Sequence, residues 1–485
     1  MSYDFDLVVL GGGTGGLVSS LIAAGVGARV ALVERAKTGG DCLWTGCVPS
    51  KSLISAARLA HRMRHADAVG LPPVAPDVDF SQVMRHVRAS ISAIEPHDSP
   101  DRLRDEGVDV ISGEGRFVDP HTLEVSGRRL SFASAIVATG SAPRTAPISG
   151  SDLSDVMNTD SFWDLAELPR RLVILGGGPI GCELGQAMGR LGSEVVLVEF
   201  ADRLLSKEEP AASALISARL AAEGVDVRLD SKAVEIRPSD DRSRELVVER
   251  PDGAKETIPF DKLLVATGRE PRTAGIGLQD AGVETDEQGA VVVDETLRTR
   301  TGNIFAVGDV TAQLPFTHVA AHHARVATVN ALFGTRRSVD DTIPWVTFTD
   351  PEVARVGMTE EQARQKWGSR AVIARSDYKS LDRAVTEADR HGFALLVGDP
   401  RGRLVGATVA APAGGEAIAE LTARVKAGDK IDAISTTVHA YPTFAEGPSR
   451  AADDHLRQRY ARRRYRIAAR IAMTARAKLT RPAER

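Results

Sequence analysis

The stretch Asp6-Leu7-Val8-Val9-Leu10-Gly11-Gly12-Gly13-Thr14-Gly15-Gly16 decides the fold of this chain. It opens with a short apolar run of the buried-strand type, and an alanine-rich segment with helical character continues to Gly25. Gly11, Gly13 and Gly16 fit the pattern GxGxxG. In that pattern the glycines permit a tight turn, let the backbone approach a pyrophosphate and let the helix pack on the strand. The stretch therefore predicts the start of a dinucleotide-binding unit.

A second strand and an acidic residue complete this unit. Residues 29–33 are largely apolar, and Glu34 follows at the distance where a carboxylate would hold a ribose hydroxyl. A lone GxGxxG pattern is weak, but the strand, the glycines, the helix, the second strand and the acid together indicate a nucleotide site.

The same unit recurs later in the chain. Residues 171–175 form an apolar run, Gly176, Gly178 and Gly181 repeat the glycine pattern, and a further strand ends at Glu199. Two units predict two dinucleotides, with a structural turn that binds no ligand as the alternative for each. Because Glu199 would accept from a 2′-hydroxyl and repel a 2′-phosphate, the second site should prefer NAD over NADP.

Two of the chain's three cysteines lie five positions apart in the stretch from Gly39 to Lys51. Pro49 suits the first turn of a helix, so Cys47 should lie at or next to a helix N-terminus, where the helix dipole stabilises a thiolate. Cys42 belongs to the preceding glycine-rich turn. Zinc fits poorly because no second cysteine pair exists. The spacing predicts a redox-active disulfide, with two unpaired core cysteines as the alternative.

Other strand ends supply candidate cofactor-binding positions. They are Thr139 and Gly140 after one apolar strand, Gly268 after a second, and Asp309 after a third. An acid at the end of a buried strand can bind a polar cofactor chain, and a helix N-cap is the alternative for Asp309.

Composition limits the class of protein. A chain of 485 residues with 43% hydrophobic residues, 26% charged residues and a net charge of −4 is typical of a globular protein and gives no electrostatic reason to expect nucleic acid. Three cysteines argue against a secreted disulfide scaffold, and the acidic N-terminus is unlike a signal peptide. We expect a cytoplasmic protein.

Together these motifs resemble the pyridine nucleotide-disulfide oxidoreductases, the flavoprotein family of lipoamide dehydrogenase, glutathione reductase and mercuric reductase. The resemblance implies an α/β fold with two Rossmann-like domains, one for FAD and one for NAD, and a C-terminal α+β dimerisation domain. It assigns the first glycine unit, Glu34 and Asp309 to FAD, and the second unit with Glu199 to NAD, with NADP less expected. It also pairs Lys51 with Glu183 beside the flavin.

The resemblance implies an electron relay from NADH through the flavin to the Cys42–Cys47 disulfide. It makes Cys47 the flavin-contacting thiolate and Cys42 the exchange thiol, with no resident metal ion. In the family's C-terminal motif a histidine precedes a proline and, with a glutamate, serves the partner subunit's disulfide. Here Tyr441 stands before the proline, Glu446 is retained, and His439 is interpreted as a bystander. Because tyrosine is a poor base at neutral pH, this substitution weakens the lipoamide and glutathione interpretations. The resemblance then favours the mercuric reductase-like branch, where tyrosine is familiar at this position.

The expected organisation has five parts. They are residues 1–150 and 270–342 for FAD, 151–269 for NAD, 343–452 for the interface of a homodimer with shared active sites, and a basic tail over 453–485. The tail is interpreted as a docked helix with a solvated basic face, and a helix lying on an anionic membrane or meeting an acidic partner is the alternative.

The leading functional hypothesis is an FAD-dependent NADH oxidoreductase whose acceptor is a small disulfide, a metal ion or a quinone. Dihydrolipoamide dehydrogenase is the alternative within the family. A flavin redox sensor, with the basic tail binding a partner or a membrane, is the alternative from another class.

Overall fold

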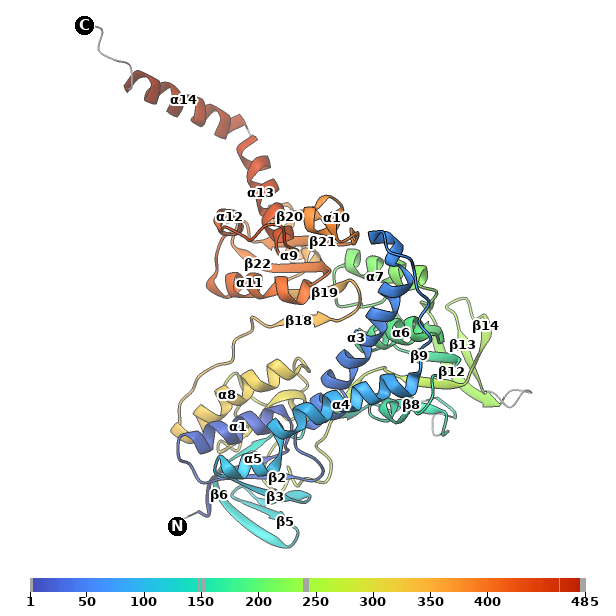
Figure 1. Ribbon diagram of the computed structural model, residues 1–485. Helices are drawn as coiled ribbons and strands as arrows, with labels where there is room; N and C mark the ends of the chain where they lie inside the picture. Colours follow the sequence, from blue (N-terminus) through green and yellow to red (C-terminus); the bar gives the residue numbers. More distant parts are fainter. Residues whose placement is uncertain (1–2, 147, 151–152, 239–243, 462, 480–485) are drawn as a thin grey trace. The chain divides into compact units, whose positions relative to one another are not determined.

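The computed structural model describes residues 3–146, 148–150, 153–238, 244–461 and 463–479. The chain divides into two compact units, drawn in Figure 1. The first unit comprises residues 1–66, 72–204 and 219–341, and the second comprises residues 67–71, 205–218 and 342–485.

The first unit begins with a sheet in the strand order β3-β2-β1-β6-β5-β4, to which β17 adds beside β6. Its strands are β1 (Phe5–Leu10), β2 (Val30–Glu34), β3 (Val108–Ser112), β4 (Gly115–Asp119), β5 (Thr122–Val125), β6 (Arg128–Val137) and β17 (Ile304–Ala306). Strands β3, β2, β1, β6 and β17 run parallel to one another. Strands β4 and β5 form antiparallel pairs at the β6 side of the sheet. From Leu7 to Leu10, β1 is buried on both faces, which explains the continuous apolar run in its sequence.

Helices cover one face of this sheet. They include α1 (Thr14–Gly25), α5 (Pro100–Asp105) and α8 (Thr317–Phe333), of which α1 and α8 lie side by side in Figure 1. Leu7, Leu17 and Phe305 are in the core on this face. The core of the other face contains Phe117 and Phe132 from the antiparallel strands.

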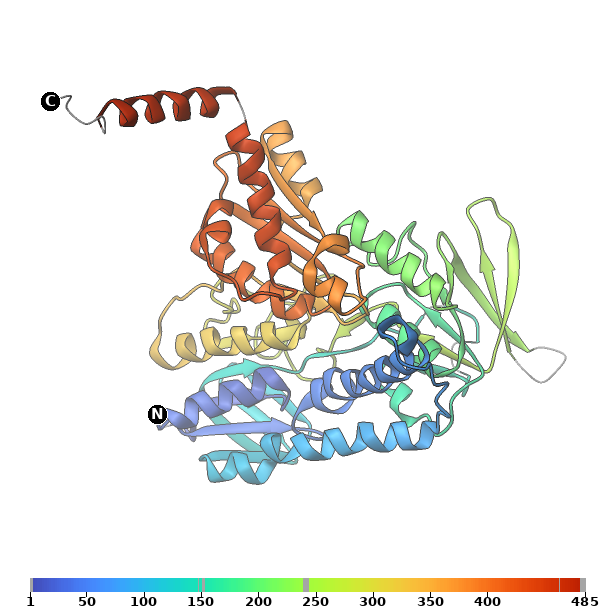
Figure 2. The same ribbon diagram turned by 45° about the horizontal axis from the view of Figure 1, so that its top comes forward.

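Further helices lead away from the first sheet. They are α2 (Gly40–Trp44), α3 (Cys47–Arg64) and α4 (Phe80–Asp98), with short 3₁₀ turns η1 (Ala66–Val69) and η3 (Gly308–Thr311). Helices α3 and α4 lie side by side (Figure 2). Helix α3 begins at Cys47, as Pro49 predicts.

A second parallel sheet in the same unit has the order β11-β10-β9-β15-β8. Its elements are β8 (Val156–Asn158), η2 (Ser161–Asp164), β9 (Arg171–Leu175), α6 (Pro179–Leu191), β10 (Glu194–Val198), β11 (Asp226–Arg228) and β15 (Lys262–Val265). Antiparallel strands β12 (Lys232–Pro238), β13 (Arg244–Glu249) and β14 (Lys255–Phe260) share a core with it. Strands β7 (Ser141–Pro143) and β16 (Arg269–Pro271) pair separately.

The second unit is built on an antiparallel sheet in the order β18-β19-β22-β21-β20. Its strands are β18 (Pro344–Thr347), β19 (Glu352–Gly357), β20 (Val372–Asp377), β21 (Phe393–Gly398) and β22 (Leu404–Ala411). Its helices and 3₁₀ turns are α9 (Glu360–Trp367), η4 (Gly368–Arg370), η5 (Tyr378–Ser380), α10 (Asp382–Thr386), α11 (Gly414–Ala427), α12 (Ile431–Thr436), α13 (Glu446–Ala461) and α14 (Arg463–Leu479). Helix α7 (Pro210–Ala222) begins in this unit and ends in the first. Residues 462 and 480–485 of the predicted tail lie outside the described residues.

Two sheets with parallel strands, each with a glycine turn between an inner strand (β1 or β9) and the helix after it, and an antiparallel sheet with helices toward the C-terminus confirm the predicted fold class. No helix in the described ranges is both long and apolar enough to span a membrane.

Candidate active site

The first glycine turn has the close contacts that a phosphate-binding loop needs. A Cβ atom on Gly11, whose φ is +110°, would lie 2.4 Å from the Ala138 carbonyl oxygen, and one on Gly16 would lie 1.8 Å from the Gly11 oxygen. Only glycine fits at either position, because a methyl group would overlap the backbone. Helix α1 therefore starts directly against the end of β1.

The second turn repeats these contacts almost atom for atom. A Cβ atom on Gly176 would lie 2.6 Å from the Ala266 oxygen, and one on Gly181 would lie 1.9 Å from the Gly176 oxygen. Gly178, by contrast, has nothing within 4 Å of the place for its Cβ. The turn is thus closed toward the strand and open at Gly178.

The two acids sit in matching positions beside these turns. Glu34 accepts backbone hydrogen bonds from Gly12 at 2.6 Å and from Ala36 at 2.7 Å. Glu199 accepts from Gly177 at 2.5 Å and from Ala201 at 2.7 Å. Each carboxylate is fixed at its strand end and keeps lone pairs for a sugar hydroxyl. Both turns and both acids fit a dinucleotide.

Cys42 and Cys47 lie on consecutive helices. Cys42 belongs to α2, a five-residue helix where the sequence predicted only a glycine-rich turn. Gly39, with a φ of +100°, turns the chain into this helix. Cys47 is the first residue of α3, and both cysteines are free thiols in the structure.

The surroundings of the two thiols separate their acidities. The pKa of Cys47 is lowered to about 6, first by a hydrogen bond from the Cys42 thiol and then by the Thr317 hydroxyl and the charge of Lys51, against the opposing effect of burial. The Cys47 sulfur lies 3.3 Å from the Thr317 oxygen. The pKa of Cys42 is raised, first by the same hydrogen bond and then by burial. The surroundings therefore favour a thiolate on Cys47 over one on Cys42.

An ion pair lies next to Cys47. Lys51, one turn along α3, donates to Glu183 of α6 at 2.8 Å, and the Glu183 side chain is only 7% exposed. The structure thus brings together Cys42, Cys47, Lys51 and Glu183, all in the first unit.

Asp309 and its neighbours form a polar network that extends to Asp41, the residue before Cys42. Ser141 donates to the Asp309 carboxylate at 2.7 Å, and burial raises the pKa of Asp309. Arg269, directly after Gly268, donates to the Ser141 hydroxyl at 2.8 Å and forms an ion pair with Asp41. The Thr139 hydroxyl donates to the Arg272 carbonyl at 2.8 Å.

The C-terminal motif residues belong to the second unit. The Tyr441 hydroxyl, on a side chain that is 68% exposed, donates to Asp382 at 2.6 Å, and this hydrogen bond raises the pKa of Tyr441. Glu446 begins α13 and accepts from the Thr443 N–H at 3.1 Å. His439 lies 2.8 Å from Glu420 of α11.

Some residues around the thiols were missed by sequence reasoning. Thr317, which contacts the Cys47 sulfur, belongs to no recognised sequence motif. Trp163, which donates a hydrogen bond to the Thr45 carbonyl, lies more than a hundred residues away in the sequence. Asp41 and Arg269 each adjoin a predicted residue, which was the only signal available for them.

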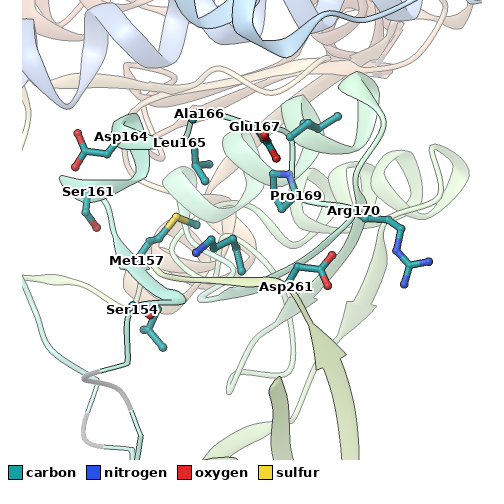
Figure 3. Close-up of a pocket in the computed structure, with 13 residues that line it drawn as sticks. Ser154, Met157, Ser161, Asp164, Leu165, Ala166, Glu167, Pro169, Arg170 and Asp261 are labelled. Carbon is teal, nitrogen blue, oxygen red and sulfur yellow. The ribbon is translucent and has the colours of Figure 1, made fainter. Parts of the chain in front are cut away.

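A pocket of about 680 Å³ opens at another place in the first unit (Figure 3). Pro169 and Arg170 of its lining precede β9, and Asp261 and Lys262 adjoin the start of β15. The pocket therefore lies at the amino ends of the strands of the second parallel sheet. The glycine turn of that sheet lies at the carboxyl ends of the strands, where nucleotides bind, so the pocket is not the nucleotide site. In the described part of the chain, no cluster of three or more histidine, cysteine or acidic residues is arranged to hold a metal ion.

Two dinucleotide-type turns and a thiol pair at a helix N-terminus define a nucleotide-dependent disulfide oxidoreductase. Comparison with known protein families gives two matches. Residues 5–324 match the family "Pyridine nucleotide-disulphide oxidoreductase", and residues 343–452 match the dimerisation domain of the same family. The chain belongs to the pyridine nucleotide-disulphide oxidoreductase family.

Curated relatives and solved structures agree with this assignment. The chain is 33% identical to the mercuric reductase of Lysinibacillus sphaericus over 93% of its own length and 82% of that protein. It is 35% identical to the dihydrolipoyl dehydrogenase of Thermus scotoductus, over 93% and 97% of the two chains. The HOCl-induced flavoprotein disulfide reductase RclA of Escherichia coli, solved as a Cu(II) complex, matches with a TM-score of 0.82 and 28% identity, over 93% and 99%.

The chain is therefore an enzyme, an FAD-dependent disulfide oxidoreductase that uses a pyridine nucleotide. Its dimerisation domain supports a homodimer.

Proposed function

We propose that Cys42 and Cys47 form the redox-active disulfide and that their electrons pass to a soft metal ion. The observation that carries this proposal is the position of Cys47 at the start of α3, beside Thr317 and one turn from the Lys51–Glu183 ion pair, with Cys42 on the helix just before it. A thiolate is both the attacking group in disulfide exchange and the preferred ligand of a soft metal. Cys42, held protonated beside it, is the thiol that meets the acceptor.

The remaining site residues fit cofactor roles under this proposal. The residues for FAD are Gly11, Gly13, Gly16, Glu34, Thr139, Gly140 and Asp309, and those for the pyridine nucleotide are Gly176, Gly178, Gly181, Glu199 and Gly268. When bound, the flavin supplies two-electron transfer between the nucleotide and the thiol pair. Lys51 and Glu183 hold a fixed charge pair beside Cys47. The carboxylate of Glu199 favours NAD, because it would repel a 2′-phosphate.

The C-terminal motif favours a metal ion over a lipoamide-type disulfide as acceptor. Reduction of a disulfide by thiols needs a group that handles the thiol proton. The single hydroxyl proton of Tyr441 goes to Asp382, and His439 is bound to Glu420. Tyr441 thus presents oxygen lone pairs and no proton. The mercuric reductases among the relatives, and the Cu(II) complex of RclA, support the same choice.

NADH consumption by the purified yellow protein tests this proposal, with Hg²⁺, Cu²⁺, lipoamide and a quinone as separate acceptors and Cys42→Ser in parallel. We expect turnover on a metal ion that is lost in Cys42→Ser, while reduction of the flavin by NADH persists. Turnover on lipoamide alone would give the dihydrolipoamide dehydrogenase alternative. Activity that survives in Cys42→Ser would remove the cysteine relay.

We further propose that the C-terminal helix contacts an anionic membrane surface. Between Arg463 and Leu479 the sequence has six basic residues and no acid, and the side chains of Ile467, Ile471 and Met473 are exposed. A basic helix with exposed apolar residues binds anionic lipid more tightly than neutral lipid. A docked helix with a solvated basic face remains the alternative.

Flotation of the full chain with vesicles tests the helix. Binding to vesicles that contain phosphatidylserine, absent from phosphatidylcholine vesicles and lost in the double variant Arg466→Glu/Arg470→Glu, is the expected result. Equal amounts of the native chain and of the variant in the vesicle fraction would contradict membrane binding by this helix and favour the docked helix. Binding that follows the redox state of the flavin, without acceptor turnover, would favour the sensor alternative.

Cellular location and domain limits belong to the same proposal. We infer a cytoplasmic enzyme because three cysteines, two of them in one redox pair, suit a reducing compartment. The domain limits given above, and active sites shared between two chains, are proposed on the family resemblance.

A further inference from the structure

Helix α2, which carries Cys42, is too short to be stable by itself. It has five residues, and a turn at Thr45 and Gly46 separates it from α3 and Cys47. An isolated helix of one turn does not persist in water, because nucleation costs more than so few hydrogen bonds return. Contacts from outside must therefore fix Cys42 relative to Cys47.

One such contact is made by Trp163 at the end of α2. The indole N–H of Trp163 donates to the Thr45 carbonyl oxygen at 2.7 Å. The indole packs edge-on against Phe162, with ring centroids 5.0 Å apart, and Phe162 is fully buried. Because an indole has one donor and no acceptor, this side chain is a fixed donor aimed at the turn between the two cysteines.

A second contact holds the other end of α2. Asp41, next to Cys42, forms ion pairs with Arg269 and, at 3.5 Å, with Arg272. Arg269 also donates to the Thr159 hydroxyl at 3.3 Å, and Arg272 donates to Asp160 at 3.5 Å. The segment from Thr159 to Trp163 thus supports α2 at its start through two arginines and at its end directly.

We propose that Trp163 is a positioning residue for the redox centre, which holds the turn between Cys42 and Cys47 so that the two sulfur atoms stay within bonding reach. The proposal rests on the proposed function of the cysteine pair. A disulfide forms only when the two Cβ atoms lie about 3.5–4.5 Å apart. A loosened turn lets α2 move away from α3, and the hydrogen bond that stabilises the Cys47 thiolate lengthens.

The variant Trp163→Phe tests this role, because it keeps a ring against Phe162 and removes the N–H donor. The measurement is the rate of alkylation of each cysteine by iodoacetamide against pH, read by mass spectrometry of the peptides. We expect the midpoint for Cys47 to move upward from its native value, and turnover at saturating NADH to fall about fivefold to tenfold, the effect of one lost hydrogen bond. The KM for NADH should not change. Trp367→Phe, the same change at the end of α9, is the matched control and should behave as the native enzyme.

Two further variants keep the test decisive. Trp163→His retains a ring N–H and should recover part of the lost turnover. Asp41→Asn loosens the other end of α2 and should move the Cys47 midpoint in the same direction, which tests the support of α2 if Trp163→Phe does not fold. An unchanged alkylation profile and unchanged turnover in Trp163→Phe would overturn the proposal. Survival of activity in Cys42→Ser would instead overturn the cysteine relay, and the alkylation profile of the Trp163 variant would still report on positioning.

Discussion

At the scale of single residues, the thiol of Cys47 has the environment that matters most for the chemistry. A hydrogen bond from Cys42, the hydroxyl of Thr317, the charge of Lys51 and the start of α3 all stabilise its anion. Burial and the Glu183 carboxylate act against them, and the net effect lowers the pKa of Cys47. The enzyme therefore has its reactive anion ready without a histidine base.

Replacing Thr317 by valine should weaken this stabilisation. The Thr317 hydroxyl lowers the pKa of Cys47, so removal of the hydroxyl should raise that pKa. As the pH falls, the Cys47 thiolate of the variant should therefore become protonated at a higher pH than in the native enzyme. Because a hydrogen bond to a charged group contributes about 1.5–3 kcal/mol, we expect the alkylation midpoint to rise by about one pH unit or more. Thr317→Ser keeps the hydroxyl and should keep the native midpoint. A native profile in Thr317→Val would show that the hydroxyl does not act on the thiolate.

Glu199 is a second residue with a measurable effect of its own. Its carboxylate is fixed by the N–H groups of Gly177 and Ala201. In Glu199→Ala the ratio of kcat/KM for NADH over NADPH should fall about tenfold, because a charge-assisted hydrogen bond to the ribose is lost and repulsion of a 2′-phosphate ends. Glu194→Ala, at the exposed start of β10, the strand that Glu199 directly follows, is the control. Equal use of both nucleotides by the native enzyme would contradict the assignment.

At the scale of secondary structure elements, the two strand–turn–helix units are built alike. In each unit a glycine with positive φ ends the strand, and a second glycine lets the helix start against the first one's carbonyl oxygen. The acid at the end of the next strand, Glu34 or Glu199, then accepts a hydrogen bond from the N–H of the residue after that first glycine, Gly12 or Gly177. These contacts involve backbone atoms, so side chains at those positions would push helix and strand apart.

Gly16→Ala should show this cost. Its new methyl group would overlap the Gly11 oxygen, so α1 must shift from β1. Forcing extra volume into a packed site costs about 1–3 kcal/mol, and we expect a loss of this size in the free energy of unfolding, measured in urea, together with weaker retention of FAD. Gly25→Ala, at the other end of α1 with open space around it, is the control. Equal stability of both variants would contradict the close packing of the turn.

At the scale of the whole molecule, shared active sites make a prediction about mixed dimers. The cysteines and the Tyr441 motif belong to different units of the chain, and the family's dimerisation domain covers residues 343–452. If a site takes its cysteines from one chain and Tyr441 from the partner, a hybrid of Cys42→Ser and Tyr441→Ala chains has one intact site.

Refolding the two variants together tests that prediction. Random pairing makes half of the dimers hybrid, so about a quarter of the native activity should return if each variant alone is inactive. Hybrids without activity would show that each site is contained in one chain. Native chains mixed with Cys42→Ser chains measure the efficiency of exchange.

The fold and the positions of the glycine turns and of Cys47 could be predicted from the sequence, because the sequence patterns that indicate them are local. GxGxxG patterns, strand ends and the proline after Cys47 each act on their own neighbours, and Lys51 with Glu183 came from the family resemblance. The sequence did not reach α2 as a helix, which depends on Gly39 entering the left-handed region and on support from distant residues. The domain limits and the roles of the site residues stay predictions.

The sequence by itself determined two dinucleotide units, a thiol pair at a helix start and a tyrosine in place of the expected histidine, since each follows from residue type and spacing. Only the tertiary structure decided which partners those residues have: Thr317 beside Cys47, Glu420 beside His439, and Asp382 beside Tyr441. These pairs join residues that are 19 to 270 positions apart. No local pattern encodes such contacts, because they arise when separate elements pack together.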